Sequence, residues 1–343
     1  MMSFRFESPF RSGMPVRSGR WIWVAAWLML LGTPAGTAWA LGTPSVPLST
    51  LESRYTTPTS RFVDIDGVRM HYKDEGTGPV VVMLHASFMS LHSWDGLAAD
   101  LARDHRVIRF DFPLAGLTGP DPQGRYSMER STELMNGLLA KLGVSSYSII
   151  ATSSGAIIGF RQAAAKPEAV TRLILINAAG MPRTPVTDPN RERGSAFSRW
   201  LQGKYKSREY WQKTLTGQFT AGEPPPADVV ERVFDFNRRA RLVEDSGIYM
   251  RNFRTGDPET VLGQVRAPTL ILWGMGNITV AHLEADVFQL WLTQAPSIKK
   301  KYPRYGHYIY MENPAIVIPD VRNFLEGRMD ADLRVTRRMP PSP

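Results

Sequence analysis

The chain of 343 residues contains no cysteine. Disulfide bonds, cysteine nucleophiles and thiolate metal sites are therefore excluded, although this absence does not decide the compartment. Histidine is also scarce, with six residues in all, and no two of them have the H-E-x-x-H spacing of a zinc protease. The sequence therefore implies no metal and no organic cofactor.

Positive charge is only in modest excess. The chain has 41 Lys and Arg and 32 Asp and Glu, which gives a net charge of +9. More than half of this excess lies in the two ends of the chain. Residues 1–40 have four arginines and one glutamate, and residues 328–343 have four arginines and two aspartates. Because no nucleic-acid motif accompanies these charges, no nucleic-acid partner is expected.

The apolar run near the N-terminus, residues 21–31, is shorter than the about 20 residues that a membrane-spanning helix needs. It follows three arginines and precedes AWA at residues 38–40, an A-x-A cleavage pattern. Residues 1–40 are therefore predicted to be a signal peptide, and the alternative is an uncleaved membrane anchor through residues 21–41. The folded part is expected to be exported (periplasmic or extracellular) or to be membrane-anchored facing away from the cytoplasm.

Strand and helix patterns alternate from residue 61 onward. Continuous apolar runs such as residues 80–84 predict buried strands, and residues 127–142 have the apolar spacing of an amphipathic helix. This alternation predicts the α/β class, with a mostly parallel central sheet covered by helices on both faces. The predicted parts are a linker at residues 41–60, the α/β core at residues 61–180 and 263–327, an aromatic-rich helical cap or lid at residues 181–262, and a disordered tail at residues 328–343. The oligomeric state is left open.

The sequence ATSSG at residues 151–155 lies between a predicted buried strand and a predicted helix of small residues. A sharp strand-to-helix turn that exposes one serine is a nucleophile elbow, and its strained backbone needs small residues two positions to either side. Ala151 and Gly155 meet this requirement around Ser153. Centring the turn on Ser154 fits less well, and the alternative to an elbow is an ordinary serine-rich loop.

The chain resembles the α/β-hydrolase superfamily from about residue 61 to residue 327. The segments that carry the resemblance occur in the family's order, so their combination is specific. They are VVMLHAS at 81–87, similar to the oxyanion strand and turn; DFPLAG at 111–116, similar to the Asp-x-Pro-Gly-x-Gly loop; ATSSG at 151–155, similar to the elbow; LILWG at 270–274, similar to the strand before the catalytic acid; and Gly306-His307 with Glu312 and Pro314, similar to the segment of the catalytic histidine.

The resemblance implies acyl transfer in which Ser153 attacks a carbonyl and His307 acts first as general base and then as general acid. It also implies an oxyanion hole made by the backbone N–H groups of Ser87 and Ser154. The family's catalytic aspartate falls on Asn277, an amide that can orient a histidine but carries no charge.

Other positions for the acid are weaker. The family tolerates an acid at the end of the preceding strand, but that position is occupied by Asn177, also an amide. Glu284 and Asp286 lie on the following predicted helix and are further candidates.

The expected function is that of a serine hydrolase acting on a small or medium carboxylic ester, a small-molecule ester-like substrate. One alternative is a slow or inactive relative that binds a ligand under its lid, and another is a C–C bond hydrolase or lactonase. Haloalkane dehalogenases and epoxide hydrolases of this fold have an aspartate at the elbow, so Ser153 disfavours both.

Overall fold

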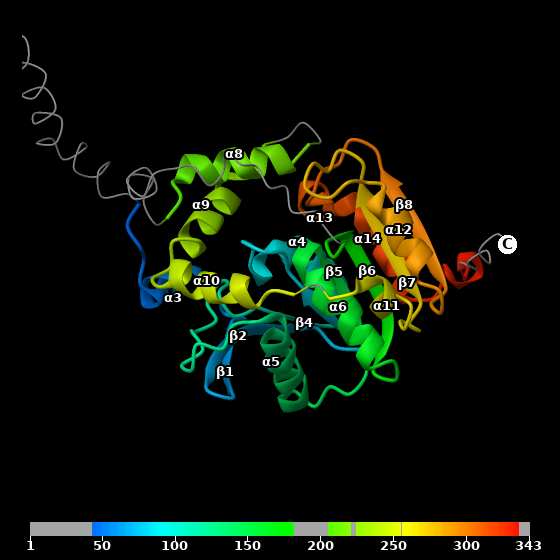
Figure 1. The fold of residues 1–343 in the computed structure, drawn as a ribbon, viewed down its shortest axis with the longest axis horizontal. Coiled ribbons are helices and arrows are strands. Elements are labelled where there is room, and N and C mark those ends of the chain that lie inside the picture. Colours follow the sequence, from blue (N-terminus) through cyan, green and yellow to red (C-terminus); the bar gives the residue numbers. More distant parts are fainter. Residues whose placement is uncertain (1–42, 182–204, 221–223, 255, 336–343) are drawn as a thin grey trace, which may run out of the picture.

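The computed structural model describes residues 43–181, 205–220, 224–254 and 256–335, and Figure 1 shows their arrangement. An eight-stranded sheet, mostly parallel, runs through the molecule and confirms the predicted α/β fold. In spatial order the strands are β1 (Arg61–Ile65), β2 (Val68–Glu75), β4 (Arg106–Phe110), β3 (Val80–Leu84), β5 (Tyr147–Thr152), β6 (Val170–Ala178), β7 (Thr269–Gly274) and β8 (Ser297–Tyr302).

Antiparallel pairing is confined to one edge of the sheet, where β2 pairs with both β1 and β4. From β4 to β8 every pair is parallel, so the carboxyl ends of these strands lie along the same edge. All six residues of β5 are buried, as are all six of β7. Such fully buried strands occur where helices cover both faces of a parallel sheet.

Two separate hydrophobic clusters, one on each face of the sheet, form the core. The helices that cover the sheet fall into two groups, one contributing side chains to each cluster. The first group comprises α5 (Met128–Lys141), α6 (Ser153–Ala165), α11 (Pro258–Leu262) and α12 (Glu284–Trp291), and the second comprises η1 (Leu91–Trp94), α4 (Asp95–Leu101), α13 (Ile309–Glu312) and α14 (Pro314–Leu325).

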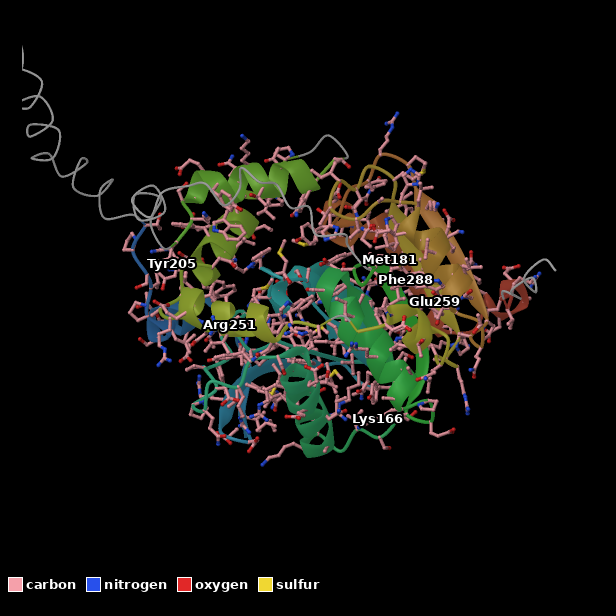
Figure 2. All side chains as sticks on the ribbon, viewed as in Figure 1. Lys166, Met181, Tyr205, Arg251, Glu259 and Phe288 are labelled. Atoms are coloured by element: carbon pink, nitrogen blue, oxygen red, sulfur yellow. The ribbon has the colours of Figure 1, made fainter. Side chains whose placement is uncertain are left out.

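Three further helices, α8 (Arg208–Gln218), α9 (Ala227–Phe236) and α10 (Leu242–Asn252), occupy the range predicted for the cap. Figure 2 shows Tyr205 and Arg251 on this side of the molecule, away from Phe288 in the core layer. Helix α11 was expected in the cap but packs on α6 and α12, so it belongs to the core layer. Residues 182–204 of the predicted cap lie outside the described residues.

The linker prediction for residues 41–60 is wrong for residues 46–55. Helix α3 (Leu48–Tyr55) lies there, and its Leu51 is fully buried in a small cluster with Val46, Leu117 and Phe236. Val46 also exchanges backbone hydrogen bonds with the segment that follows α9. The Pro, Ser and Thr residues suggested a linker because the apolar contacts that order this segment are made with distant parts of the chain.

The prediction of a disordered tail is wrong for residues 328–335. Asp330, in η2 (Asp330–Asp332), pairs with Arg172, and Arg334 forms a backbone bridge with Ser297 at the start of β8. Residues 336–343 lie outside the described residues, as does the predicted signal peptide or anchor at 1–41. Within the described ranges, no helix is both long enough and apolar enough to cross a membrane.

Candidate active site

Ser153 occupies the junction between β5 and α6, where the chain turns sharply from strand to helix. Its φ of +50° is left-handed, a conformation that is rare and strained for a residue with a side chain. A Cβ on Gly155 would lie 2.5 Å from the carbonyl oxygen of His85 and 2.6 Å from that of Leu84, so only glycine fits there. This geometry is that of a nucleophile elbow centred on Ser153.

His307 follows β8 and is almost fully buried, with 1% of its surface exposed. Its Nδ1 lies 3.2 Å from Oδ1 of Asn277, which follows β7. The identity of that oxygen is fixed by the backbone, because Oδ1 also accepts the N–H groups of Thr279 and Val280. An oxygen with these neighbours can only accept, so His307 carries its proton on Nδ1, and Nε2 is the basic nitrogen of the neutral ring.

Only the oxygen of the Asn277 side-chain amide has hydrogen-bond partners in the described part of the chain. Its Nδ2 is buried and has no hydrogen-bond partner there. A buried donor without an acceptor costs about 1–3 kcal/mol.

Asn177 does not replace the missing acid, because its side chain binds backbone groups. Its Oδ1 accepts the N–H of Gly274, while its Nδ2 donates to the carbonyl oxygens of Gly306 and His307. The amide therefore ties the end of β7 to the loop that carries His307. Two residues later, the N–H of Ala179 donates to the carbonyl oxygen of Ser153 at 3.0 Å. The same short segment thus contacts the backbones of both Ser153 and His307.

The acidic candidates on α12 have other partners. Asp286 forms ion pairs with Lys299 and Lys301 of β8, and Glu284 accepts the N–H of Ala281 just before the helix. The structure therefore places Asn277, the position obtained by counting along the chain, against His307.

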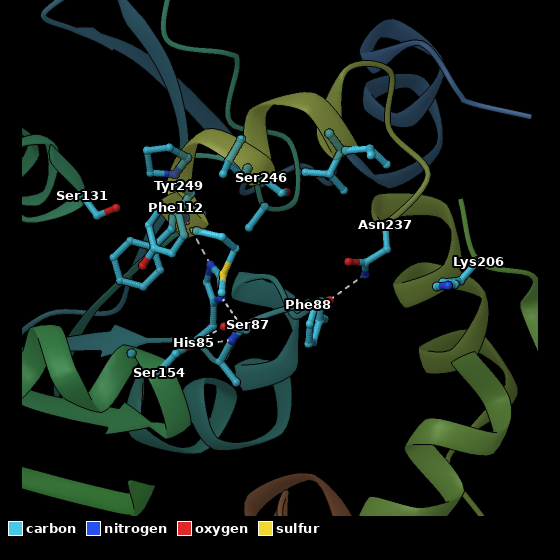
Figure 3. A pocket seen from close by; sticks show the side chains of 18 of the residues that line it. His85, Ser87, Phe88, Phe112, Ser131, Ser154, Lys206, Asn237, Ser246 and Tyr249 are labelled. Atoms are coloured by element: carbon cyan, nitrogen blue, oxygen red, sulfur yellow. Dashed lines mark hydrogen bonds between the residues drawn. The ribbon is translucent and has the colours of Figure 1, made fainter. Parts of the chain in front are cut away.

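The predicted oxyanion donors lie side by side, but one of them is already engaged. The N–H of Ser87 donates to Oγ of Ser154 at 2.7 Å, and the hydroxyl of Ser87 donates to the same oxygen at 2.8 Å (Figure 3). An oxyanion in this position would have to displace the Ser154 hydroxyl from the Ser87 amide. This contact depends on side-chain orientation, and no sequence pattern indicated it.

We expect Ser154→Ala to raise kcat/KM for an ester by up to about fivefold. The change removes the Ser154 hydroxyl that accepts the Ser87 N–H and would compete for it with a substrate oxyanion, and a single neutral hydrogen bond is worth about 1 kcal/mol. Steady-state kinetics with a short p-nitrophenyl ester would measure it, with Ser87→Ala as the control that keeps the amide. A loss of activity in Ser154→Ala would show that the hydroxyl supports the oxyanion hole instead of competing for it.

His85 is a structural residue beside this loop. Its Nδ1 donates to the carbonyl oxygen of Ala86 at 2.8 Å, and its Nε2 accepts the N–H of Phe112 at 3.1 Å. Both ring nitrogens are therefore used by the neutral form, and burial lowers the pKa of His85 below its ordinary value. The ring joins the oxyanion turn to the loop after β4.

Asp111 at the end of β4 organises that loop, a role not predicted from sequence. Its carboxylate accepts hydrogen bonds from Nδ1 of His71 and from the N–H groups of Leu91 and Leu117. Burial by itself favours the neutral acid, but these hydrogen bonds hold the pKa of Asp111 below its ordinary value. A Cβ on Gly116 would lie 2.0 Å from a carboxylate oxygen of Asp111, so the loop can close around this group only with glycine there.

A pocket of about 430 Å³ lies between the oxyanion turn and the cap (Figure 3). It reaches Ser87 and Ser154 on the core side and helix α10 on the cap side. Most of its wall is apolar or aromatic. The wall includes Phe88, residues 112–115, Ile158, Trp211, Leu242, Val243, Tyr249 and Met250, with Ser131, Lys206, Asn237 and Ser246 as further polar residues. Such a pocket suits a substrate with a substantial apolar part.

Comparison with known proteins gives a consistent picture. A family model described as alpha/beta hydrolase fold matches residues 79–314. A 2-hydroxy-6-oxononadienedioate/2-hydroxy-6-oxononatrienedioate hydrolase of Dechloromonas aromatica is 27% identical over 74% of this chain and 91% of its own length. A pimeloyl-[acyl-carrier protein] methyl ester esterase of Nitrosomonas europaea is 25% identical over 71% and 95%.

Two further matches differ in extent. An uncharacterized protein of Mycobacterium tuberculosis is 30% identical over 124 residues, so the match spans only 36% of that protein's length and 36% of this chain. The crystal structure of a membrane phospholipase A, described as a bacterial virulence factor, superposes with a TM-score of 0.65 at 24% identity. It covers 89% of this chain and 98% of the phospholipase chain. At this identity the likeness concerns the fold.

Proposed function

Because this chain belongs to the alpha/beta hydrolase fold family, we propose that it is a serine hydrolase that cleaves a small or medium carboxylic ester. The observation that carries the proposal is the hydrogen bond between Nδ1 of His307 and Oδ1 of Asn277. It gives the imidazole the tautomer that a general base needs, and Ser153 lies in a strained turn at the carboxyl end of β5, on the same sheet edge. Relatives named as hydrolases support the reaction class.

In the proposed reaction His307 removes the proton from the hydroxyl of Ser153 as its oxygen attacks the ester carbonyl. The backbone N–H groups of Ser154 and Ser87 hold the oxyanion of the tetrahedral intermediate. His307 then protonates the leaving alcohol, which leaves an acyl group on Ser153. Water, deprotonated by His307, hydrolyses this acyl-enzyme and regenerates the serine.

A second candidate function is ligand binding with little or no turnover. It is favoured by two observations: Asn277 brings no negative charge to His307, and the Ser87 amide is occupied by Ser154. C–C bond hydrolysis or lactone opening by the same Ser153 remains a further alternative, which a substrate panel would separate from ester hydrolysis.

Labelling with a fluorophosphonate probe tests the proposed nucleophile. We expect stoichiometric labelling of the folded protein, with the modified peptide carrying the probe on Ser153. Ser153→Ala is expected to abolish the label, whereas Ser154→Ala, which alters the neighbouring hydroxyl, is expected to keep it. An unlabelled folded protein that also fails to turn over short p-nitrophenyl esters would contradict the proposal and leave ligand binding as the better function.

A further inference from the structure

The pocket contains positive charge and no negative charge in its wall. None of its lining residues is an aspartate or glutamate. His85 is held neutral by its two hydrogen bonds and by burial, and burial raises the pKa of Tyr249 to about 12, so its hydroxyl is also uncharged at neutral pH. Of the lysines, arginines and carboxylates in the described part of the chain, Lys206 is the one that lines this pocket, so its ammonium group supplies the positive charge of the wall.

Ser87 and Ser154 lie apart from Lys206 in the pocket, and Ser131, Asn237 and Ser246 add polar groups elsewhere along its wall (Figure 3). Beside Ser87 and Ser154, the N-terminus of α6 adds the partial positive charge of a helix start. Figure 3 shows Lys206 at the opposite end of the view, beyond Phe88 and Asn237. A substrate whose carbonyl lies at the oxyanion turn would therefore extend past apolar side chains before its far end meets the ammonium group.

Lys206 has no carboxylate within ion-pair distance in the described part of the chain, and its ammonium nitrogen lies 5.5 Å from the centre of the Tyr210 ring. Neighbouring cap arginines are different, since Arg208 pairs with Glu231 and Arg238 pairs with Asp235. A cation in a pocket wall that has no anionic partner of its own can pair with an anionic group of a ligand.

We propose that Lys206 makes this pocket selective for esters whose acyl chain ends in a carboxylate, that is, monoesters of medium-length dicarboxylic acids. The inference rests on the proposed ester hydrolase function. Lys206 is exposed to solvent, so its attraction for a carboxylate is screened. The selectivity is therefore modest, about fivefold, and depends on salt.

The test uses p-nitrophenyl monoesters of adipic, suberic and sebacic acid, each compared with the same ester capped as a methyl ester at its far end. At low salt we expect kcat/KM to favour the acid-ended ester for at least one chain length. Lys206→Gln is expected to lower the ratio of kcat/KM for the acid-ended ester to that for the capped ester by about fivefold. A concentration of 1 M NaCl is expected to lower the same ratio by a similar factor. Lys206→Arg keeps the charge and should keep the preference.

Lys213→Gln is the matched control, because Lys213 lies on α8, is exposed and does not line the pocket. Equal or better cleavage of the methyl-capped ester at all three lengths, or an unchanged ratio in Lys206→Gln, would overturn the inference while leaving the ester hydrolase function intact.

If neither ester is cleaved, the proposed function has failed, and calorimetry decides the inference alone. Monomethyl suberate is then expected to bind the full chain more tightly than dimethyl suberate, and Lys206→Gln is expected to weaken only the acid-ended compound. Equal affinity for the two compounds, or no binding of either, would overturn it.

Discussion

Asn277→Asp is expected to raise kcat for ester hydrolysis by about 100-fold. The introduced carboxylate would accept the same three hydrogen bonds as the amide oxygen, from Nδ1 of His307 and from the backbone of Thr279 and Val280. It would add a negative charge beside the imidazolium that forms when His307 takes the proton of the nucleophile.

The size of this effect follows from the tautomer. In a serine protease triad, changing the aspartate to asparagine costs about 10⁴ in kcat, and part of that cost arises because the amide selects the wrong tautomer of histidine. Here the backbone orients the oxygen of Asn277 toward His307, so the tautomer is already correct and only the charge is missing. The gain should therefore be smaller than about 10⁴.

The pH dependence gives an independent check on the same variant. A carboxylate beside the ring favours the protonated imidazole, so the pKa of His307 should be higher in Asn277→Asp than in the parent protein. Because the base must be neutral to act, the acid limb of the kcat/KM profile is expected to move to higher pH.

Asn177→Asp is the matched control. Nδ2 of Asn177 donates to the carbonyl oxygens of Gly306 and His307, and a carboxylate oxygen in its place would repel both. This variant should lose stability and gain no activity. If Asn277→Asp leaves kcat unchanged or lowers it, and the acid limb of its kcat/KM profile does not move, then another residue orients His307.

The sequence predicted the parts of the molecule that depend on neighbours along the chain. The alternation of buried strands and helices predicted the parallel sheet, and the small residues around Ser153 predicted a turn whose left-handed φ the structure shows. The resemblance to the family, counted from Gly274, pointed to Asn277, and the structure places that side chain against His307. The catalytic roles of these residues stay predictions.

Features that depend on distant parts of the chain could not be predicted in this way. Leu51 orders α3 by packing on Leu117 and Phe236, so a segment rich in turn-forming residues becomes a helix. The engagement of the Ser87 amide by Ser154 depends on a rotamer. The position of Lys206 at the pocket depends on how the cap folds back over the sheet.

Arg239 illustrates the same point, and its loss should have the largest effect on stability. This residue follows α9, is 5% exposed, and donates from Nη1 to the carbonyl oxygens of Ala115, Gly116 and Thr118. Burial lowers the pKa of its guanidinium, and the charge of nearby Asp111 opposes that change, so the group remains charged. The side chain thereby ties the cap to the loop that lines the pocket.

Arg239→Ala is expected to lower the free energy of unfolding by about 3 kcal/mol or more, because three buried carbonyl oxygens lose a charged donor and a cavity replaces the side chain. Urea unfolding of the full chain would measure the loss. Arg251→Ala is the control, since Arg251 lies exposed on the neighbouring helix α10 (Figure 2). The control should change stability by less than about 0.5 kcal/mol.

The same variant should also raise KM for esters. Ala115 belongs to the stretch that lines the pocket, and Leu242, three residues after Arg239, lines it from the cap. Without the guanidinium, these two walls are no longer held to each other, so substrate binding should weaken more than the chemical step. An Arg239→Ala protein as stable as Arg251→Ala, with an unchanged KM, would show that the cap is positioned by its apolar contacts alone.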